Sequence, residues 1–88
     1  MGCSTPLIRT VATPAYGRVV IEASDGNRYS SDLSSFQKVW CYPPDGDAWS
    51  RVSIDTYGLA LLWACRFEVH VDQVVALADK IDRADAAA

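Results

Sequence analysis

An Asp25-Gly26 pair lies between two segments of extended character, and it constrains the fold more than any other feature of the sequence. Residues 18–23 read RVVIEA and are rich in β-branched side chains, which favour a strand. Residues 28–33 can supply a weaker return strand. Because Asp and Gly both tolerate a positive φ, the pair predicts a type I′ turn. The sequence therefore predicts an antiparallel hairpin in which Asp25 turns the chain and has no acid–base role.

Three other segments have the pattern of strands. Residues 7–13 form a first candidate strand, which Pro14 should end because proline cannot donate to a sheet. Residues 51–63 predict a second hairpin that turns at DTYG, and its return strand is apolar on both faces, as central strands are. In residues 67–71, FEVHV, apolar and polar residues alternate with the period of a half-buried strand.

Two helices are expected beside these strands. Residues 32–40 begin with Asp and Ser capping signals and suit one or two helical turns. The prolines and glycine of 41–49 should keep that segment irregular. Asp72 is expected to cap a final helix over 73–83. Its apolar stripe is Val74, Leu77, Ala78 and Ile81, and Asp79 and Arg83 stand at the spacing of an i,i+4 ion pair.

These elements together define an α+β fold class. We expect a small antiparallel sheet built from hairpins, one short mid-chain helix, and a C-terminal helix packed on the sheet. The chain has 88 residues, and half of them are apolar, which suits a single domain over 1–88. Residues 1–6 and 84–88 add little packing and are expected to fray.

The charge pattern restricts the class of partner. The formal net charge is −3, and the eight Lys and Arg residues are scattered singly. Nucleic-acid surfaces need clustered basic residues to neutralise phosphates, so direct nucleic-acid binding is not expected. No apolar window has the length of a signal-peptide core or a membrane span, which predicts a cytoplasmic protein without a membrane partner. Three widely spaced cysteines and a single histidine predict packed thiols, with no metal and no cofactor.

The sequence carries no catalytic constellation, and we expect no enzyme activity. Glu68 and His70 should share the polar face of a strand, but no motif places a Ser or Cys nucleophile beside them. Asp45 and Asp47 flank Gly46 and offer too few oxygen ligands for a calcium loop. A solvated turn is the simpler interpretation of these two carboxylates.

Aromatic residues around the Pro-rich loop PPDGD are further candidates for function. They either close one end of the core or anchor a partner, since aromatic residues are typical binding anchors. We expect Trp49 to be structural, because it leads directly into the next strand, and Tyr42 to be exposed, because it precedes Pro43. The candidate partner-binding residues are therefore Trp40, Tyr42, Trp49, Glu68 and His70.

Several short motifs recur in a familiar order over residues 8–77. They are SDGN followed by Tyr and DLS, an aromatic at Phe36, then WSRVSID and GLALLW. After Trp63, Glu68-Val69 and Asp72 stand at a matching spacing, while Arg66 replaces a usual glycine. The chain thereby resembles a family of short bacterial proteins known as domain of unknown function twenty-four forty-two. The resemblance implies a small α+β fold with antiparallel strands and a C-terminal helix, and it implies no catalytic residues.

The same resemblance implies two settings for function. Some members of that family are encoded beside another small protein in arrangements that look like toxin–antitoxin pairs, and others are fused to a helix-turn-helix DNA-binding segment. We therefore expect a non-enzymatic module that binds another protein, such as the inhibitory half of a two-gene pair. The alternative is a regulatory or small-ligand-binding domain that acts with a DNA-binding partner chain. A homo-oligomer is compatible with either function.

Overall fold

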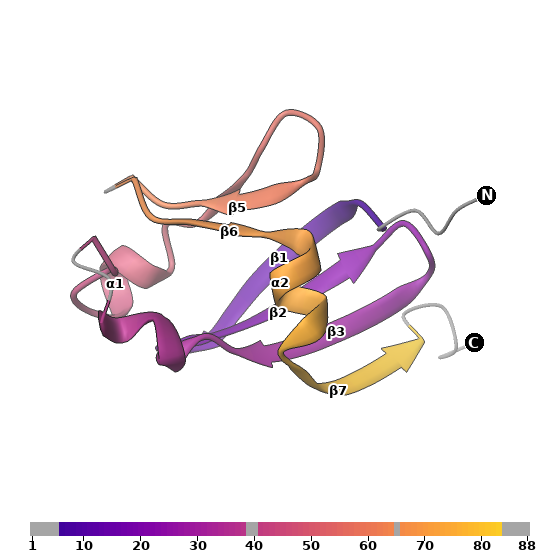
Figure 1. The fold of residues 1–88 in the computed structure, drawn as a ribbon, viewed down its shortest axis with the longest axis horizontal. Coiled ribbons are helices and arrows are strands. Elements are labelled where there is room, and N and C mark those ends of the chain that lie inside the picture. Colours follow the sequence, from indigo (N-terminus) through magenta and orange to yellow (C-terminus); the bar gives the residue numbers. More distant parts are fainter. Residues whose placement is uncertain (1–5, 39–40, 65, 84–88) are drawn as a thin grey trace.

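The computed structural model describes residues 6–38, 41–64 and 66–83, and it shows a small α+β fold (Figure 1). The expected fold class is confirmed, with the strands divided between two antiparallel sheets. The larger sheet has the order β1-β2-β3-β7, with β1 Ile8–Ala15, β2 Arg18–Ala23, β3 Asn27–Asp32 and β7 Ala78–Arg83. The smaller sheet has the order β4-β5-β6, with β4 Ser53–Ile54, β5 Ala60–Leu62 and β6 Glu68–His70.

Three short helical segments join the strands. They are a 3₁₀ helix, η1 Ser34–Lys38, and two α-helices, α1 Gly46–Trp49 and α2 Val71–Ala76. The predicted mid-chain helix is therefore present as η1, and residues 39 and 40 of its predicted range lie outside the described residues. The prediction that 41–49 is wholly irregular is wrong. The Asp45 carboxylate accepts a hydrogen bond from the Ala48 amide at 2.9 Å, and this N-cap allows α1 to begin after the two prolines.

The first hairpin is antiparallel as predicted, but its turn is not type I′. Gly26 has a positive φ of 87°, whereas Asp25 does not. The Gly26 amide donates to the Ala23 carbonyl at 3.0 Å, and the Asp25 carboxylate accepts from the Asn27 amide at 2.9 Å. This pattern is a three-residue turn in which only the last residue needs the left-handed conformation. Asp25 stabilises the turn through its side chain, in keeping with a structural role.

Strand β1 continues through Pro14, so the prediction that this proline ends the strand is wrong. β1 is the first strand in the order of the larger sheet and pairs with β2 on one side only. Register shifts between Ala12 and Ala15 interrupt the ladder there. An edge position and an irregular ladder both relieve proline of the need to donate a hydrogen bond.

The C-terminal helix is shorter than predicted, because only its first half is helical. α2 spans Val71–Ala76, its N-cap is His70 in place of the expected Asp72, and residues 78–83 form strand β7. β7 pairs with β3 and completes the larger sheet. The predicted pairing of Asp79 with Arg83 on a helix is wrong, because there is no helix there, and Asp79 pairs instead with Arg18 at 2.6 Å. The Arg83 side chain lies outside the described residues.

A bulge explains why β7 has a helix-like spacing in its sequence. Ala78 lies opposite Ser31 and Lys80 lies opposite Ser30, so Asp79 is an extra residue in the strand. The extra residue places Ala78 and Ile81 on the same face although they are three positions apart. A separation of three residues is also the spacing of one helix face, so the pattern is ambiguous until β3 supplies the pairing partner.

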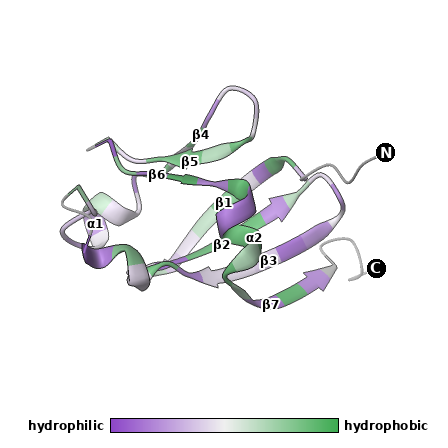
Figure 2. Ribbon diagram, in the orientation of Figure 1, coloured by the Kyte–Doolittle hydropathy of each residue, from purple (hydrophilic) through white to green (hydrophobic). Residues whose placement is uncertain are grey.

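The core lies between the larger sheet, the smaller sheet and α2. Buried side chains from β2 meet those from β6 and α2: Val19, Ile21, Val69 and Val74 are all fully buried. Figure 2 shows hydrophobic residues along β2 and β5, whereas β3 is largely hydrophilic. β3 is nevertheless joined to α2, because the buried Ser31 hydroxyl donates to the Val74 carbonyl at 2.6 Å. The hydrogen bond satisfies a polar group that would otherwise be costly to bury.

Candidate functional site

Strand β6 and its neighbours divide their side chains strictly between two faces. Phe67, Val69 and Val71 are buried, whereas Glu68 and His70 point outward. The predicted alternation of FEVHV is confirmed, as is the central place of β5 in its sheet. The outward face of this strand is therefore available for recognition, and its inward face belongs to the core.

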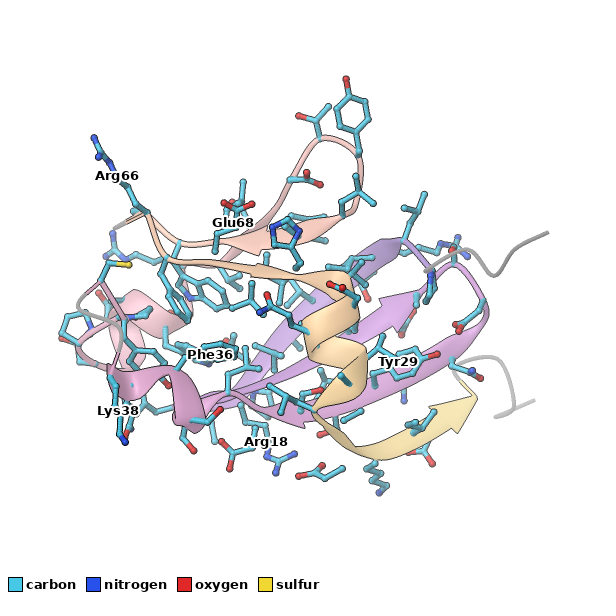
Figure 3. All side chains as sticks on the ribbon, viewed as in Figure 1. Arg18, Tyr29, Phe36, Lys38, Arg66 and Glu68 are labelled. Carbon is cyan, nitrogen blue, oxygen red and sulfur yellow. The ribbon has the colours of Figure 1, made fainter. Side chains whose placement is uncertain are left out.

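Glu68 and His70 form the centre of an exposed polar surface. The His70 Nε2 lies 3.5 Å from the Glu68 Oε2, and the side chains of the two residues are 61% and 49% exposed. Figure 3 shows Glu68 on the side of β6 away from the larger sheet. An open depression of about 300 Å³ surrounds them, lined by Asp55, Leu59, Ala60, Glu68, His70, Val71 and Asp72. We call this surface the acidic face.

The turn between β4 and β5 shapes one wall of the acidic face. The Asp55 carboxylate accepts hydrogen bonds from the amides of Tyr57 at 3.1 Å and Leu59 at 2.7 Å. Gly58 has a φ of 73°, and its carbonyl accepts from the Ile8 amide at 2.7 Å, which fastens the turn to β1. A Cβ at Gly58 would lie 2.9 Å from the Ile8 carbonyl oxygen, so this approach requires glycine.

This turn also exposes apolar side chains beside the carboxylates. Tyr57 is 72% exposed and Leu59 is 43% exposed, although Leu59 also lines the depression. Leu7, across the junction with β1, is exposed as well. The sequence predicted the turn at DTYG but assigned no function to Tyr57 or Leu59. The one sequence feature that could have indicated a role for them is their position on either side of the turn glycine, Gly58.

The titratable groups that line the acidic face are carboxylates and an imidazole. Its lining contains three carboxylates and one imidazole, and it contains no hydroxyl, thiol or amine. The separation of 3.5 Å between Glu68 and His70 is long for an orienting hydrogen bond, and both groups are well solvated. Within the described residues, no group of three or more His, Cys, Asp or Glu side chains is arranged to hold a metal ion. The acidic face therefore presents negative charge beside an exposed leucine.

Trp49, which follows the Pro-rich loop, lies in the core. It is 1% exposed, and its indole stacks on that of Trp63 with a centroid separation of 4.7 Å. The Trp49 Nε1 donates to the Arg18 carbonyl at 3.0 Å, and the Trp63 Nε1 donates to the Trp49 carbonyl at 2.8 Å. The expectation that Trp49 is structural is confirmed. Trp40 lies outside the described residues.

The expectation that Tyr42 is exposed is wrong. The centroid of its ring lies 5.3 Å from that of Trp49 and 5.2 Å from that of Phe67. The Tyr16 ring packs against it in a T-shaped arrangement, with a centroid separation of 6.0 Å. The Tyr42 hydroxyl is buried and has no hydrogen-bond partner within the described part of the chain. Burial raises the pKa of Tyr42, with a smaller contribution from Tyr16. The partners of Tyr42 lie in the turn between β1 and β2, in α1 and directly before β6. A position directly before Pro43 gives no sign of these contacts.

Tyr16 is a residue of this aromatic cluster that sequence reasoning missed. Its hydroxyl donates to the Pro43 carbonyl at 2.6 Å, and its ring meets both Tyr42 and Trp49 edge-on. Tyr16 lies in the tight turn between β1 and β2, next to Gly17, whose φ is 85°. An aromatic residue before a turn glycine was the available signal. The contact holds the Pro-rich loop against the larger sheet.

The turn between β5 and β6 has an arginine, Arg66, in a backbone conformation that favours glycine. Arg66 has a φ of 70° and is the only non-glycine residue with positive φ in the described ranges. Its amide donates to the Trp63 carbonyl at 3.1 Å, and the Trp63 amide donates to the Phe67 carbonyl at 2.9 Å. Figure 3 shows the Arg66 side chain pointing away from the protein. This turn fixes the register that sends Glu68 outward.

Comparisons with known proteins found no relative of this chain. No family model, no curated protein and no solved structure matches the chain. The resemblance to domain of unknown function twenty-four forty-two therefore stays a prediction. None of the helices in the described residues is long and apolar enough to cross a membrane.

Proposed function

We propose that this chain is a non-enzymatic protein-interaction module whose binding surface is the acidic face. The observation that carries the proposal is the depression on the smaller sheet, where Asp55, Glu68 and Asp72 surround the exposed Leu59. A surface that combines apolar side chains with a charged rim is typical of protein interfaces. The Pro-rich loop is not the favoured surface, because Trp49 is buried in the core and the partly buried Tyr42 packs against it.

The chemistry of the acidic face favours one kind of partner. Its carboxylates attract Lys or Arg, and Leu59 offers apolar contact within the same depression. Tyr57 is exposed on the adjoining turn. A partner segment with a basic residue next to an apolar residue matches both features. Small-ligand pockets span roughly 300–1,000 Å³ and bury most of the ligand. The depression is at the lower limit of that range and open to solvent, which favours a protein segment over a small molecule.

The biological setting that we propose is the inhibitory half of a two-gene pair, acting in the cytoplasm. An acidic module of this size can neutralise a partner by covering a basic functional surface, since charge complementarity both speeds association and selects the partner. The acidic composition of the chain and its resemblance to a family with such gene pairs support this setting.

A charge-reversal capture experiment tests the proposal. The whole chain is used as bait in extract from its native host, and captured proteins are quantified by mass spectrometry. We expect one stoichiometric partner for the wild type and loss of that partner for Glu68→Lys. Asp47→Lys is the matched control, because Asp47 lies on α1, away from the acidic face, and is equally able to change charge without disturbing the core.

Two results would count against the proposal. One is the absence of any stoichiometric partner for the wild-type bait. The other is equal capture by Glu68→Lys and Asp47→Lys, which would make the interaction a response to net charge alone. Affinity for the identified partner should also fall as salt rises, because screening weakens contacts between exposed charges.

A further inference from the structure

Among the strands of the described residues, β7 forms an open edge of the larger sheet. It is the last strand in the order β1-β2-β3-β7 and pairs with β3 on one side (Figure 1). Its described outward-lying residues are exposed, and Ile81 is 55% exposed in spite of being aliphatic. An edge strand presents unpaired N–H and C=O groups, which can pair with another strand. β7 is therefore a place where this fold can be extended.

The pairing with β3 fixes which way the side chains of β7 point. Ile81 lies opposite Tyr29, whose side chain is buried in the core, so Ile81 belongs to the core side of the sheet. Lys80 lies opposite Ser30 and Asp82 lies opposite Arg28, so these two charged residues share the other face. The Lys80 Nζ is 3.9 Å from the Asp82 carboxylate, which confirms that they are neighbours there.

Strand β7 is also held firmly at its beginning. The Arg18 guanidinium donates to both carboxylate oxygens of Asp79, at 3.0 and 2.6 Å, and to the Ser30 hydroxyl at 2.8 Å. These bonds tie β7 to β2 across β3. The edge is thereby ordered before any partner arrives, which lowers the entropic cost of pairing.

The sequence of β7 is complementary to itself in one antiparallel register. If Ile81 faces Ile81 of a second copy, Lys80 of each copy lies opposite Asp82 of the other, on the same face. Centring the pairing one residue earlier places Lys80 against Lys80, and centring it one residue later places Asp82 against Asp82. Parallel pairing in register also sets like charges together. Of these four arrangements, the antiparallel register centred on Ile81 is the one that places Lys80 opposite Asp82.

We propose that the partner of the β7 edge is a second copy of this chain, paired antiparallel about Ile81. The two four-stranded larger sheets then become one continuous sheet of eight strands (4 + 4). The exposed Ile81 side chains of the two copies cover each other, and two Lys80–Asp82 pairs flank them. This interface is separate from the acidic face, so it stands or falls independently of the proposed function.

Charge reversal with complementation tests this pairing. Analytical ultracentrifugation of the whole wild-type chain, over rising concentration, should show a monomer–dimer equilibrium. Lys80→Asp and Asp82→Lys should each weaken self-association about tenfold or more, because both cross-strand pairs become repulsive. An equimolar mixture of the two variants should dimerise again, since each new charge then meets its opposite across the interface.

Thermal melting of each variant supplies the control for folding. Lys80 and Asp82 are exposed, so both variants should melt as cooperatively as the wild type. The mixture is a second control, because a variant whose β7 has become detached cannot regain a dimer by mixing. A wild type that remains monomeric at millimolar concentration overturns the proposal. So does a mixture that associates no better than the separate variants, which would assign any self-association to another surface.

Discussion

The two faces of the smaller sheet carry side chains of similar chemical interest and use them in opposite ways. On the inner face, Trp63 and Phe67 join Trp49 and Tyr42 in an aromatic cluster. On the outer face, Glu68 and His70 are exposed to solvent beside an open depression, although Glu68 directly follows Phe67 in the chain. The inner face stabilises the fold, whereas the outer face is exposed to solvent.

The difference shows that residue type alone does not identify a binding site. Tryptophan and tyrosine dominate interface hot spots, but the same residues bury large areas when a small core needs them. Here the turn at Arg66 and the tight turn at Tyr16 bring the aromatic rings together beneath the Pro-rich loop. The outward face is left with carboxylates and with the apolar residues of the turn between β4 and β5.

Truncation of Trp49 is the change with the largest expected effect. We expect Trp49→Ala to lower the free energy of unfolding by about 3–5 kcal/mol, because it empties a core site and leaves the Arg18 carbonyl without its indole donor. Chemical denaturation measures the loss. Trp49→Phe should cost less, since it retains much of the ring packing. An unchanged midpoint for Trp49→Ala would contradict its place in the core.

Removal of the Tyr42 hydroxyl should have a smaller effect of the opposite sign. The hydroxyl is buried and has no hydrogen-bond partner among the described residues, and such a group costs about 1–3 kcal/mol relative to a satisfied one. We therefore expect Tyr42→Phe to raise the melting temperature while it preserves the ring contacts. Tyr16→Phe is the matched control, because it removes a hydroxyl that donates to Pro43 and should lower the melting temperature. A destabilised Tyr42→Phe would show that the hydroxyl has a partner.

Glycine at position 66 should stabilise the hairpin formed by β5 and β6. A non-glycine residue in the left-handed region costs roughly 1–2 kcal/mol, and the greater flexibility of glycine in the unfolded chain offsets about 0.4–1 kcal/mol of the gain. Arg66→Gly should therefore raise the unfolding free energy by a fraction of that cost. Arg66→Ala removes the side chain but keeps the strain, so it should give no increase. Equal stability of the two variants would contradict the strain at Arg66.

A pH titration separates carboxylates that stabilise the fold from those offered to a partner. The hydrogen bond from Arg18 lowers the pKa of Asp79 below its ordinary value of 3.8, although burial opposes the shift. A carboxyl whose pKa is lower in the folded state stabilises the fold above its unfolded pKa, and this contribution is lost as the pH falls through the folded pKa. Thermal melts below pH 4 should therefore show a shallower loss of stability for Asp79→Asn than for the wild type.

Local patterns predicted the parts of the fold that depend on local chemistry. The alternation of FEVHV placed Glu68 and His70 outward, and the DTYG segment predicted a turn that ends on Gly58. The α+β class followed from the hairpins. Trp49 was assigned to the core because of its place before a strand. Each of these features is decided by neighbours within a few positions along the chain.

The features that sequence missed depend on distant partners. Residues 78–83 become a strand because β3 offers an edge and because the bulge at Asp79 tolerates a three-residue spacing. Tyr42 is partly buried because Tyr16 and Phe67 pack against it from other elements. The depression on the acidic face is lined by Asp55 together with Glu68 and Asp72, and Asp55 is far from the other two in the chain. No local pattern contains that juxtaposition.

The most direct test of the division between the two faces uses adjacent residues of one strand segment. The free energy of unfolding is measured by chemical denaturation for Phe67→Ala and Glu68→Ala in parallel. We predict a loss of about 3–5 kcal/mol for the buried Phe67 and a change within about 0.5 kcal/mol for the exposed Glu68. Comparable losses at the two positions would contradict the account, because Glu68 would then belong to the structure that holds the fold together.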